Sequence, residues 1–118
     1  KEKRTVYEIV KESQKAGLKA VKPQKTCASV DDTCRKIIEE HSYGPHFIHS
    51  TGHGIGLDVH ENPSISGKSK EKLKKNMVIT VEPGIYIPKK FGVRIEDSLI
   101  VKDRASVMHK FTKDLIVI

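Results

Sequence analysis

The chain has 118 residues, which is enough for one domain with its own hydrophobic core. Hydrophobic residues make up 36% and charged residues 31%, as in soluble globular proteins, and no apolar run is long enough to span a membrane. The formal net charge is +7, but the lysines lack the interleaved arginines and aromatics of a nucleic-acid site, so we expect neither nucleic-acid nor membrane binding.

The first half of the chain has the periodicity of two helices. In residues 5–21 apolar side chains recur near helical spacing between lysines and glutamates, and Pro23 ends this segment. Residues 29–32 have the pattern of a capping box, with Asp32 in the place of the usual glutamate. We therefore expect a second helix over residues 29–41, before the break at Gly44-Pro45.

The second half is expected to consist of short strands and turns, with one short helix. Residues 47–51 are expected as a strand, residues 61–63 as the start of a loop, and the lysine-rich residues 68–75 as a helix. Further strands are expected at residues 77–81, 84–87, 93–101, 106–110 and 115–117. Two helices, a loop and a strand-rich tail make one α+β domain over residues 1–118, with no internal repeat.

Cys27 and Cys34 are the only cysteines. On one helix, seven residues of separation place them about 10 Å apart, which is too far for a disulfide. Two reduced thiols favour a cytoplasmic location.

Three short motifs bring together the residue types that bind divalent metals. They are H-S-T-G-H-G-I-G-L-D-V-H-E (His49 to Glu61), V-E-P-G-I-Y (Val81 to Tyr86) and V-R-I-E-D (Val93 to Asp97). Neutral imidazole and carboxylate groups suit Mn, Co, Zn or Fe. Metal sites used for hydrolysis keep a coordination position open for water, so a small ligand set is no objection. The motifs therefore indicate a metal-dependent hydrolase.

A lone histidine is more often structural or solvated than a metal ligand, and we interpret His41, His46 and His109 in that way. His53 differs because Gly52 and Gly54 flank it. Glycines let the backbone approach a metal or substrate closely and adopt a positive φ, so we expect both properties there.

At these motifs the chain resembles the pita-bread metallopeptidases, the family of methionine aminopeptidase, aminopeptidase P and prolidase. The resemblance implies the C-terminal half of that catalytic domain, with two helices and a curved, mainly antiparallel sheet. It also implies two divalent ions, Mn or Co before Zn or Fe, held by ligands in the order Asp, Asp, His, Glu, Glu. Matching the motifs places the last three ligands at His53, Glu82 and Glu96, and the two aspartates would precede this chain.

The flanking residues favour the branch of the family that cleaves Xaa-Pro bonds. Methionine aminopeptidases usually have phenylalanine before the histidine matched by His60, where this chain has Val59. His49, four residues before His53, resembles the prolidase and aminopeptidase P pattern. The resemblance implies a proline-containing peptide substrate, a missing N-terminal half that completes the site, and a homodimer when the protein is complete. We expect the chain alone to be inactive.

The resemblance also implies a role for each remaining residue. Glu82 is expected to be both a ligand and the proton shuttle between water and the leaving proline nitrogen. His49 and His60 are expected to hydrogen-bond the substrate and the developing oxyanion. Arg94 is expected to orient a glutamate ligand, and Glu96, if buried in its strand, would require a metal or Arg94.

Three alternatives stay open. A pita-bread fold without metal would be a peptide- or partner-binding module. The basic charge leaves a nucleic-acid-binding domain as a second class. Methionine aminopeptidase is the third, with weaker support from the flanking residues.

Overall fold

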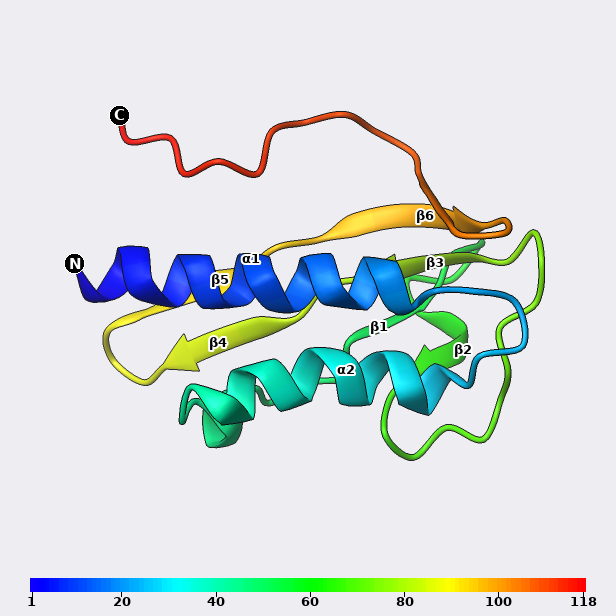
Figure 1. Cartoon of the computed structure of the whole chain (residues 1–118), viewed down its shortest axis with the longest axis horizontal. Helices are drawn as coiled ribbons and strands as arrows, with labels where there is room; N and C mark the ends of the chain where they lie inside the picture. Colours follow the sequence, from blue (N-terminus) through cyan, green and yellow to red (C-terminus); the bar gives the residue numbers. More distant parts are fainter.

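The computed structural model describes all residues, 1–118, as two helices packed on an antiparallel sheet (Figure 1). Helix α1 spans Glu2–Ala20 and α2 spans Cys27–Glu40, and the two lie side by side in opposite directions. A short 3-10 turn, η1 (Gly44–His46), precedes the strands. The strands are β1 (Gly52–Gly54), β2 (Glu61–Ile65), β3 (Val78–Val81), β4 (Gly84–Ile87), β5 (Phe91–Arg94), β6 (Asp97–Val101) and β7 (Ala105–Val107).

The strands form two sheets. Five of them make the main sheet in the order β2-β1-β3-β6-β7, and every neighbouring pair is antiparallel. Strands β4 and β5 make a separate antiparallel pair that extends the β3–β6 pair. The architecture is therefore the α+β arrangement expected from the sequence. No helix in the structure is both long and apolar enough to cross a bilayer.

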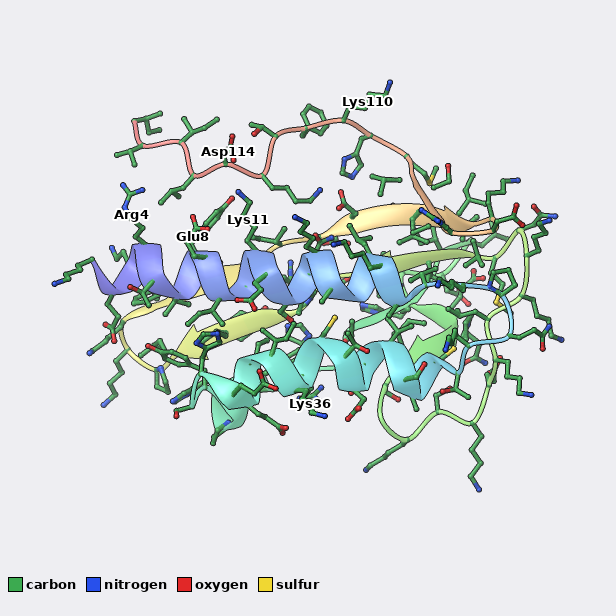
Figure 2. The ribbon with its side chains drawn as sticks, viewed as in Figure 1. Arg4, Glu8, Lys11, Lys36, Lys110 and Asp114 are labelled. Carbon is green, nitrogen blue, oxygen red and sulfur yellow. The ribbon has the colours of Figure 1, made fainter.

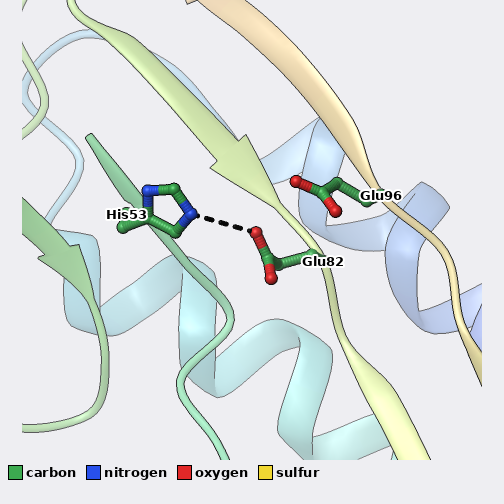
Figure 3. Close-up of side chains that lie close together, drawn as sticks. All are labelled: His53, Glu82 and Glu96. Carbon is green, nitrogen blue, oxygen red and sulfur yellow. Dashed lines mark ion pairs between the residues drawn. The ribbon is translucent and has the colours of Figure 1, made fainter. Parts of the chain in front are cut away.

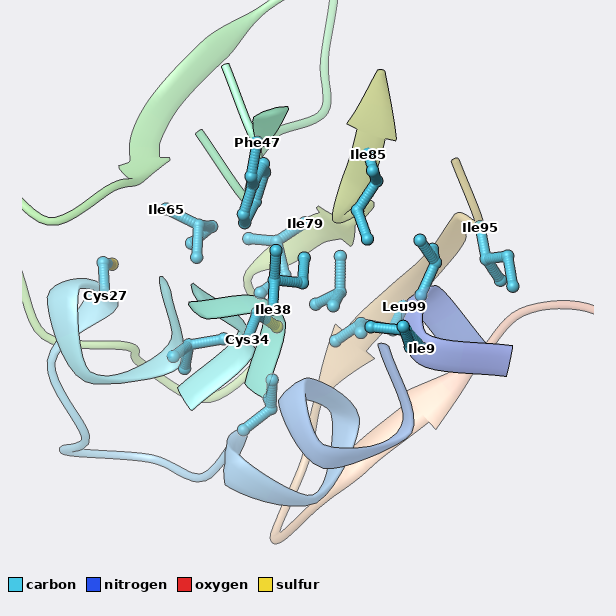
Figure 4. Packing of buried hydrophobic residues seen from close by; sticks show 14 of the residues in the cluster. Ile9, Cys27, Cys34, Ile38, Phe47, Ile65, Ile79, Ile85, Ile95 and Leu99 are labelled. Carbon is cyan, nitrogen blue, oxygen red and sulfur yellow. The ribbon is translucent and has the colours of Figure 1, made fainter. Parts of the chain in front are cut away.

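The core lies between the helices and the main sheet (Figure 4). Its helical contribution is a stripe of apolar residues on each helix, and its sheet contribution comes from alternating residues of β3 and β6. The fully buried members of these elements are Val6, Val10, Cys27, Val30, Cys34, Ile38, Ile79, Val81, Leu99 and Val101. Because side chains alternate across a strand, the residues between the buried ones on β3 and β6 point to the other face of the sheet.

Helix α2 begins earlier than the capping-box pattern predicted. Its N-cap is Thr26, whose hydroxyl oxygen accepts a hydrogen bond from the Ser29 amide at 3.1 Å. Ser29 lies inside the first turn, where its hydroxyl donates to the Thr26 carbonyl at 2.7 Å. The predicted start at Ser29 is wrong because Thr26 offers the same side-chain acceptor three residues earlier.

The lysine-rich helix predicted at residues 68–75 is absent. This segment instead pairs in extended form with the connection between α1 and α2. The Leu73 amide donates to the Lys25 carbonyl and the Gln24 amide donates to the Leu73 carbonyl, both at 2.8 Å. Thr26 and Lys72 form a further isolated bridge. Buried Leu73 anchors this pairing, and the contact overrides the helical propensity of the lysines.

Four predictions about the strands are also wrong. Residues 47–51 form no strand, whereas residues 61–65, where a loop was expected to begin, form β2. The predicted strand 93–101 is divided into β5 and β6, with Ile95 and Glu96 between them. Residues 105–107, not 106–110, form the last strand.

The chain after β7 returns across α1 and forms no strand at residues 115–117 (Figure 2). The Tyr7 hydroxyl donates to the Lys113 carbonyl at 2.7 Å, and Lys11 pairs with Asp114 at 3.0 Å. Lys113 also places its ammonium group 2.6 Å from the buried carboxylate of Asp97. Side-chain contacts therefore hold this segment where backbone pairing was expected.

Helices α1 and α2 approach closely at Gly17. A methyl group at this position would lie 2.4 Å from the Cys34 sulfur and 3.1 Å from Val81. We predict that Gly17→Ala lowers the free energy of unfolding by about 1–3 kcal/mol, although alanine is the better helix former, because the helices must separate. Urea denaturation measures this change. Since Cys34→Ala removes the obstructing sulfur, the double variant should be less destabilised than the sum of the two single variants. Additive effects would contradict the packing explanation.

Candidate functional site

The interruption between the β3–β6 and β4–β5 pairs places two glutamates opposite each other. The register is the same on both sides of the interruption, so the strands pass through it without slipping. The flanking pairs are Val81 opposite Asp97 and Gly84 opposite Arg94. Continuing this register sets Glu82 opposite Glu96. Directly opposed residues lie about 5 Å apart and share a face of the sheet.

His53 joins the same face through β1. Strand β1 pairs with β3 in a register that sets His53 opposite Thr80, and the His53 amide donates to the Thr80 hydroxyl at 3.1 Å. Thr80 and Glu82 are two residues apart on an extended segment, so their side chains point the same way. The helices cover the other face of β3. The site therefore lies on the face of the sheet that the helices leave free.

The structure brings His53, Glu82 and Glu96 together, as the motifs predicted (Figure 3). Each offers one ligand atom, and these atoms lie within 4.8 Å of one another. The His53 and Glu82 side chains are largely buried, with exposed fractions of 20% and 13%. Glu96, between β5 and β6, is exposed.

The arrangement of His53 and Glu82 fits a cation. The Nδ1 atom of His53 lies 2.8 Å from the Gly54 carbonyl, which only accepts, so Nδ1 carries the proton. In the neutral ring, Nε2 then presents a lone pair toward Glu82 Oε2 at 3.3 Å. That carboxylate oxygen is buried and has no hydrogen-bond donor. Two electron-pair donors therefore face each other, an arrangement that either a proton on Nε2 or a metal cation between the two atoms would satisfy.

The pKa of Glu96 is raised above its ordinary value. Desolvation of the carboxyl is the largest cause, followed by the negative charge of Glu82 and the hydrogen bond that a protonated Glu96 makes to it. The charges of Arg94 and His53 oppose the shift. The two carboxyl groups are therefore too close for both to ionise freely without added positive charge.

The glycines beside His53 permit close approach of the backbones, but none has a positive φ. A methyl group on Gly52 would lie 1.9 Å from the Thr80 carbonyl oxygen, and one on Gly54 would lie 2.2 Å from the Asn62 carbonyl oxygen. The expectation of a left-handed conformation is wrong. These glycines are needed because the neighbouring strands pass directly over them.

His49 lies beside the metal-ligand cluster and is held at both ring nitrogens. Its Nδ1 donates to the Ser50 carbonyl at 2.7 Å, and its Nε2 accepts from the Tyr86 hydroxyl at 2.8 Å. The rings of His49 and Tyr86 also meet edge to face. Substrate contact through His49 would therefore require exchange of the Tyr86 hydrogen bond.

His60 and Arg94 line the same open cleft of about 890 Å³ as His53 and Glu82. The His60 ring packs edge-on against His53, with 4.5 Å between ring centroids, and its nitrogens make no hydrogen bond. Arg94 is exposed and forms neither an ion pair nor a hydrogen bond with either glutamate, although its charge lowers the pKa of Glu96. The catalytic roles of His60 and Arg94 stay predictions.

Sequence reasoning missed two residues of the site. Tyr86 orients His49, and Thr80 orients the backbone of His53. The spacing carries a signal for both, because Thr80, Glu82, Gly84 and Tyr86 alternate along one extended segment and such residues share a face.

The raised pKa of Glu96 generates a prediction for the metal-free chain. A carboxyl whose pKa is raised on folding stabilises the folded state only while protonated, below its unfolded pKa, and this contribution is lost as pH rises through the folded value. We expect Glu96→Gln to gain stability relative to the native chain as pH rises from about 4 to about 7. Urea unfolding in the presence of a chelator tests this. A stability difference that does not change with pH would contradict the proximity of the two carboxyl groups.

Comparison with known proteins identifies the family. A profile of metallopeptidase family M24 matches residues 1–103. The Xaa-Pro dipeptidase of Pyrococcus furiosus is 52% identical over 103 residues, which cover 87% of this chain and 30% of that protein. The chain thus spans about a third of the length of the curated relatives it matches.

Solved structures show the same fold. The prolidase from Pyrococcus furiosus matches with a TM-score of 0.92 and 49% identity, covering 95% of this chain and 34% of that one. The Xaa-Pro dipeptidase from Bacillus anthracis matches with a TM-score of 0.96 and 44% identity, covering 99% and 33%. The resemblance to the prolidase branch and the pita-bread fold are confirmed. The chain belongs to metallopeptidase family M24.

Proposed function

We propose that residues 1–118 are the C-terminal part of the catalytic domain of a divalent-metal peptidase that hydrolyses Xaa-Pro bonds. The observation that carries the proposal is the convergence of the His53, Glu82 and Glu96 ligand atoms, with a buried Glu82 oxygen that has no donor. Relatives of this chain that are named Xaa-Pro dipeptidase support the substrate class.

His53 Nε2 and the carboxylates of Glu82 and Glu96 would hold the metal. Mixed imidazole and carboxylate donors suit Mn or Co first, with Zn or Fe as alternatives. Two ions are proposed, and the rest of the polypeptide would supply the remaining ligands. When bound, such ions supply Lewis-acid chemistry that polarises a carbonyl and makes water nucleophilic at neutral pH.

Each side chain in and around the cluster has a proposed catalytic role. Glu82 would carry the proton from water to the leaving proline nitrogen, since its carboxylate lies at the centre of the site. His60 has both ring nitrogens free at the cleft, which supports its role as the direct hydrogen-bond donor to the substrate. His49 would act together with Tyr86, to which it is bonded. Arg94 would orient the Glu96 carboxylate, and its charge lowers the pKa of that group.

The wider setting is also proposed. Leu57 and Val59 are highly exposed apolar side chains on the loop beside the cleft, which supports their burial by the rest of the protein or by the second subunit of a homodimer. Cys27 and Cys34 are buried and reduced, which supports a cytoplasmic location. A proline substrate suits a site that does not depend on the amide N–H of the scissile bond, because proline lacks it.

The proposal is tested by a chimera in which this chain replaces the matching segment of the Pyrococcus furiosus dipeptidase. We predict metal-dependent hydrolysis of Xaa-Pro dipeptides by the chimera and none of comparable rate by the isolated chain. Glu82→Gln should lower kcat by about 10²–10⁴-fold, because it removes a ligand charge and the proton shuttle. His60→Ala should lower turnover while the metal content stays nearly intact.

Metal content is measured beside activity in each variant. Loss of metal from His60→Ala would show that this residue is a ligand. A folded, metal-loaded chimera that cleaves no Xaa-Pro bond would contradict the proposed function. Full activity of the isolated chain would contradict the proposal that the rest of the polypeptide supplies the remaining ligands.

A further inference from the structure

The segment of residues 47–51 leads to the ligand cluster without forming a strand of its own. It carries His49 toward the cleft and connects η1 to β1. Its backbone carbonyls at Phe47 and His49 have no partner in a sheet. Both are instead bound by one side chain from helix α2.

That side chain is Arg35. Its Nη1 donates to the Phe47 carbonyl and its Nη2 to the His49 carbonyl, each at 2.9 Å. Its guanidinium carbon also lies 4.0 Å from the centre of the Phe47 ring. Arginine suits this task because its planar group holds several donors in a fixed geometry, which the point charge of lysine does not.

Asp31, one turn earlier on α2, fixes the guanidinium and the end of the segment. Its two oxygens accept from Arg35 Nε and Nη2, both at 3.1 Å. Oδ1 also accepts from the Thr51 hydroxyl at 2.8 Å and the Thr51 amide at 3.2 Å. Asp31 is only 2% exposed, so its charge depends on these donors.

The position of this segment affects the ligand cluster through a backbone hydrogen bond to Glu82. The Thr51 carbonyl accepts a hydrogen bond from the Glu82 amide at 2.6 Å, so the backbone of the central glutamate is fixed by the residue that Asp31 holds. His53 follows two residues after Thr51. His49 keeps the ring position that Tyr86 requires only while its backbone stays in place.

We propose that the Asp31–Arg35 ion pair is a positioning element for the site, which sets His49 and the backbone of Glu82 relative to each other. The proposal rests on the proposed function for its catalytic consequence, but its structural content is independent of activity. A role in stability alone explains less, because a buried ion pair is often no more stabilising than apolar packing. Here its hydrogen bonds go to the one segment that joins α2 to the site.

The test compares Arg35→Lys with Val30→Ala, a core change on the same helix that leaves both members of the ion pair in place. Hydrogen exchange of the Glu82 amide is measured by NMR against that of Val101, whose amide is bonded to the Met77 carbonyl away from the site. We expect Arg35→Lys to speed Glu82 exchange by about 10-fold relative to Val101. Val30→Ala should change both amides equally. An equal change of both amides in Arg35→Lys would overturn the proposal.

A second pair keeps the test decisive if Arg35→Lys does not fold. Thr51→Val keeps the volume of the side chain but removes the hydroxyl that donates a hydrogen bond to Asp31. Thr51→Ser keeps this hydroxyl and loses a methyl group. Faster Glu82 exchange relative to Val101 is expected in Thr51→Val only. The same result in both variants would overturn the proposal.

The catalytic consequence is measured in the chimera. We expect Arg35→Lys to lower kcat by about 10- to 100-fold with little change in KM, since misplacement of catalytic groups slows chemistry more than binding. If the unaltered chimera is inactive, the proposed function fails, and the exchange experiment still decides whether the ion pair positions the site. An unchanged kcat in an active chimera would refute the positioning role.

Discussion

The site depends on one register that continues through a break in the sheet. Because β3–β6 and β4–β5 are parts of the same hairpin, the two residues that interrupt each strand stay opposite their partners. This places Glu82 and Glu96 face to face. Like charges directly opposite each other destabilise a sheet, so the arrangement is reasonable only where a cation compensates them. Desolvation is the largest cause of the raised pKa of Glu96, and the negative charge of Glu82 adds to it.

The two faces of β3 have different roles, because one packs into the core and the other carries residues of the candidate site. Ile79 and Val81 point into the core under α1 and α2, while Thr80 and Glu82 point to the open face. Alternation along a single strand is sufficient to produce this division. The helices nevertheless affect the chemical face, because the Asp31–Arg35 pair reaches past the core to the segment before β1. The hydrogen bonds that Arg35 and Asp31 make with the backbone of residues 47–51 thus connect helix α2 to the site.

The sequence predicted the helices and the ligand cluster better than the connections. Helical periodicity located α1 and α2. The resemblance of the three motifs to the pita-bread family singled out His53, Glu82 and Glu96, whose ligand atoms the structure brings within 4.8 Å of one another. The segment of residues 68–75 was predicted as a helix from its lysines, but its pairing with Gln24 and Lys25 is a contact between distant residues. Residues 47–51 were predicted as a strand from their composition. The composition does not reveal that Arg35, and not a neighbouring strand, binds the carbonyls of Phe47 and His49. The hydrogen bond between Tyr86 and His49 was missed for the same reason.

The central claim is that His53, Glu82 and Glu96 form one cation site. Anomalous diffraction from crystals of the chain grown with Mn²⁺ tests it most directly. We expect a metal peak among His53 Nε2 and the two carboxylates, at about 2.0–2.3 Å from its ligand atoms. A peak bound elsewhere on the chain, or no peak while these three side chains still converge, would contradict it.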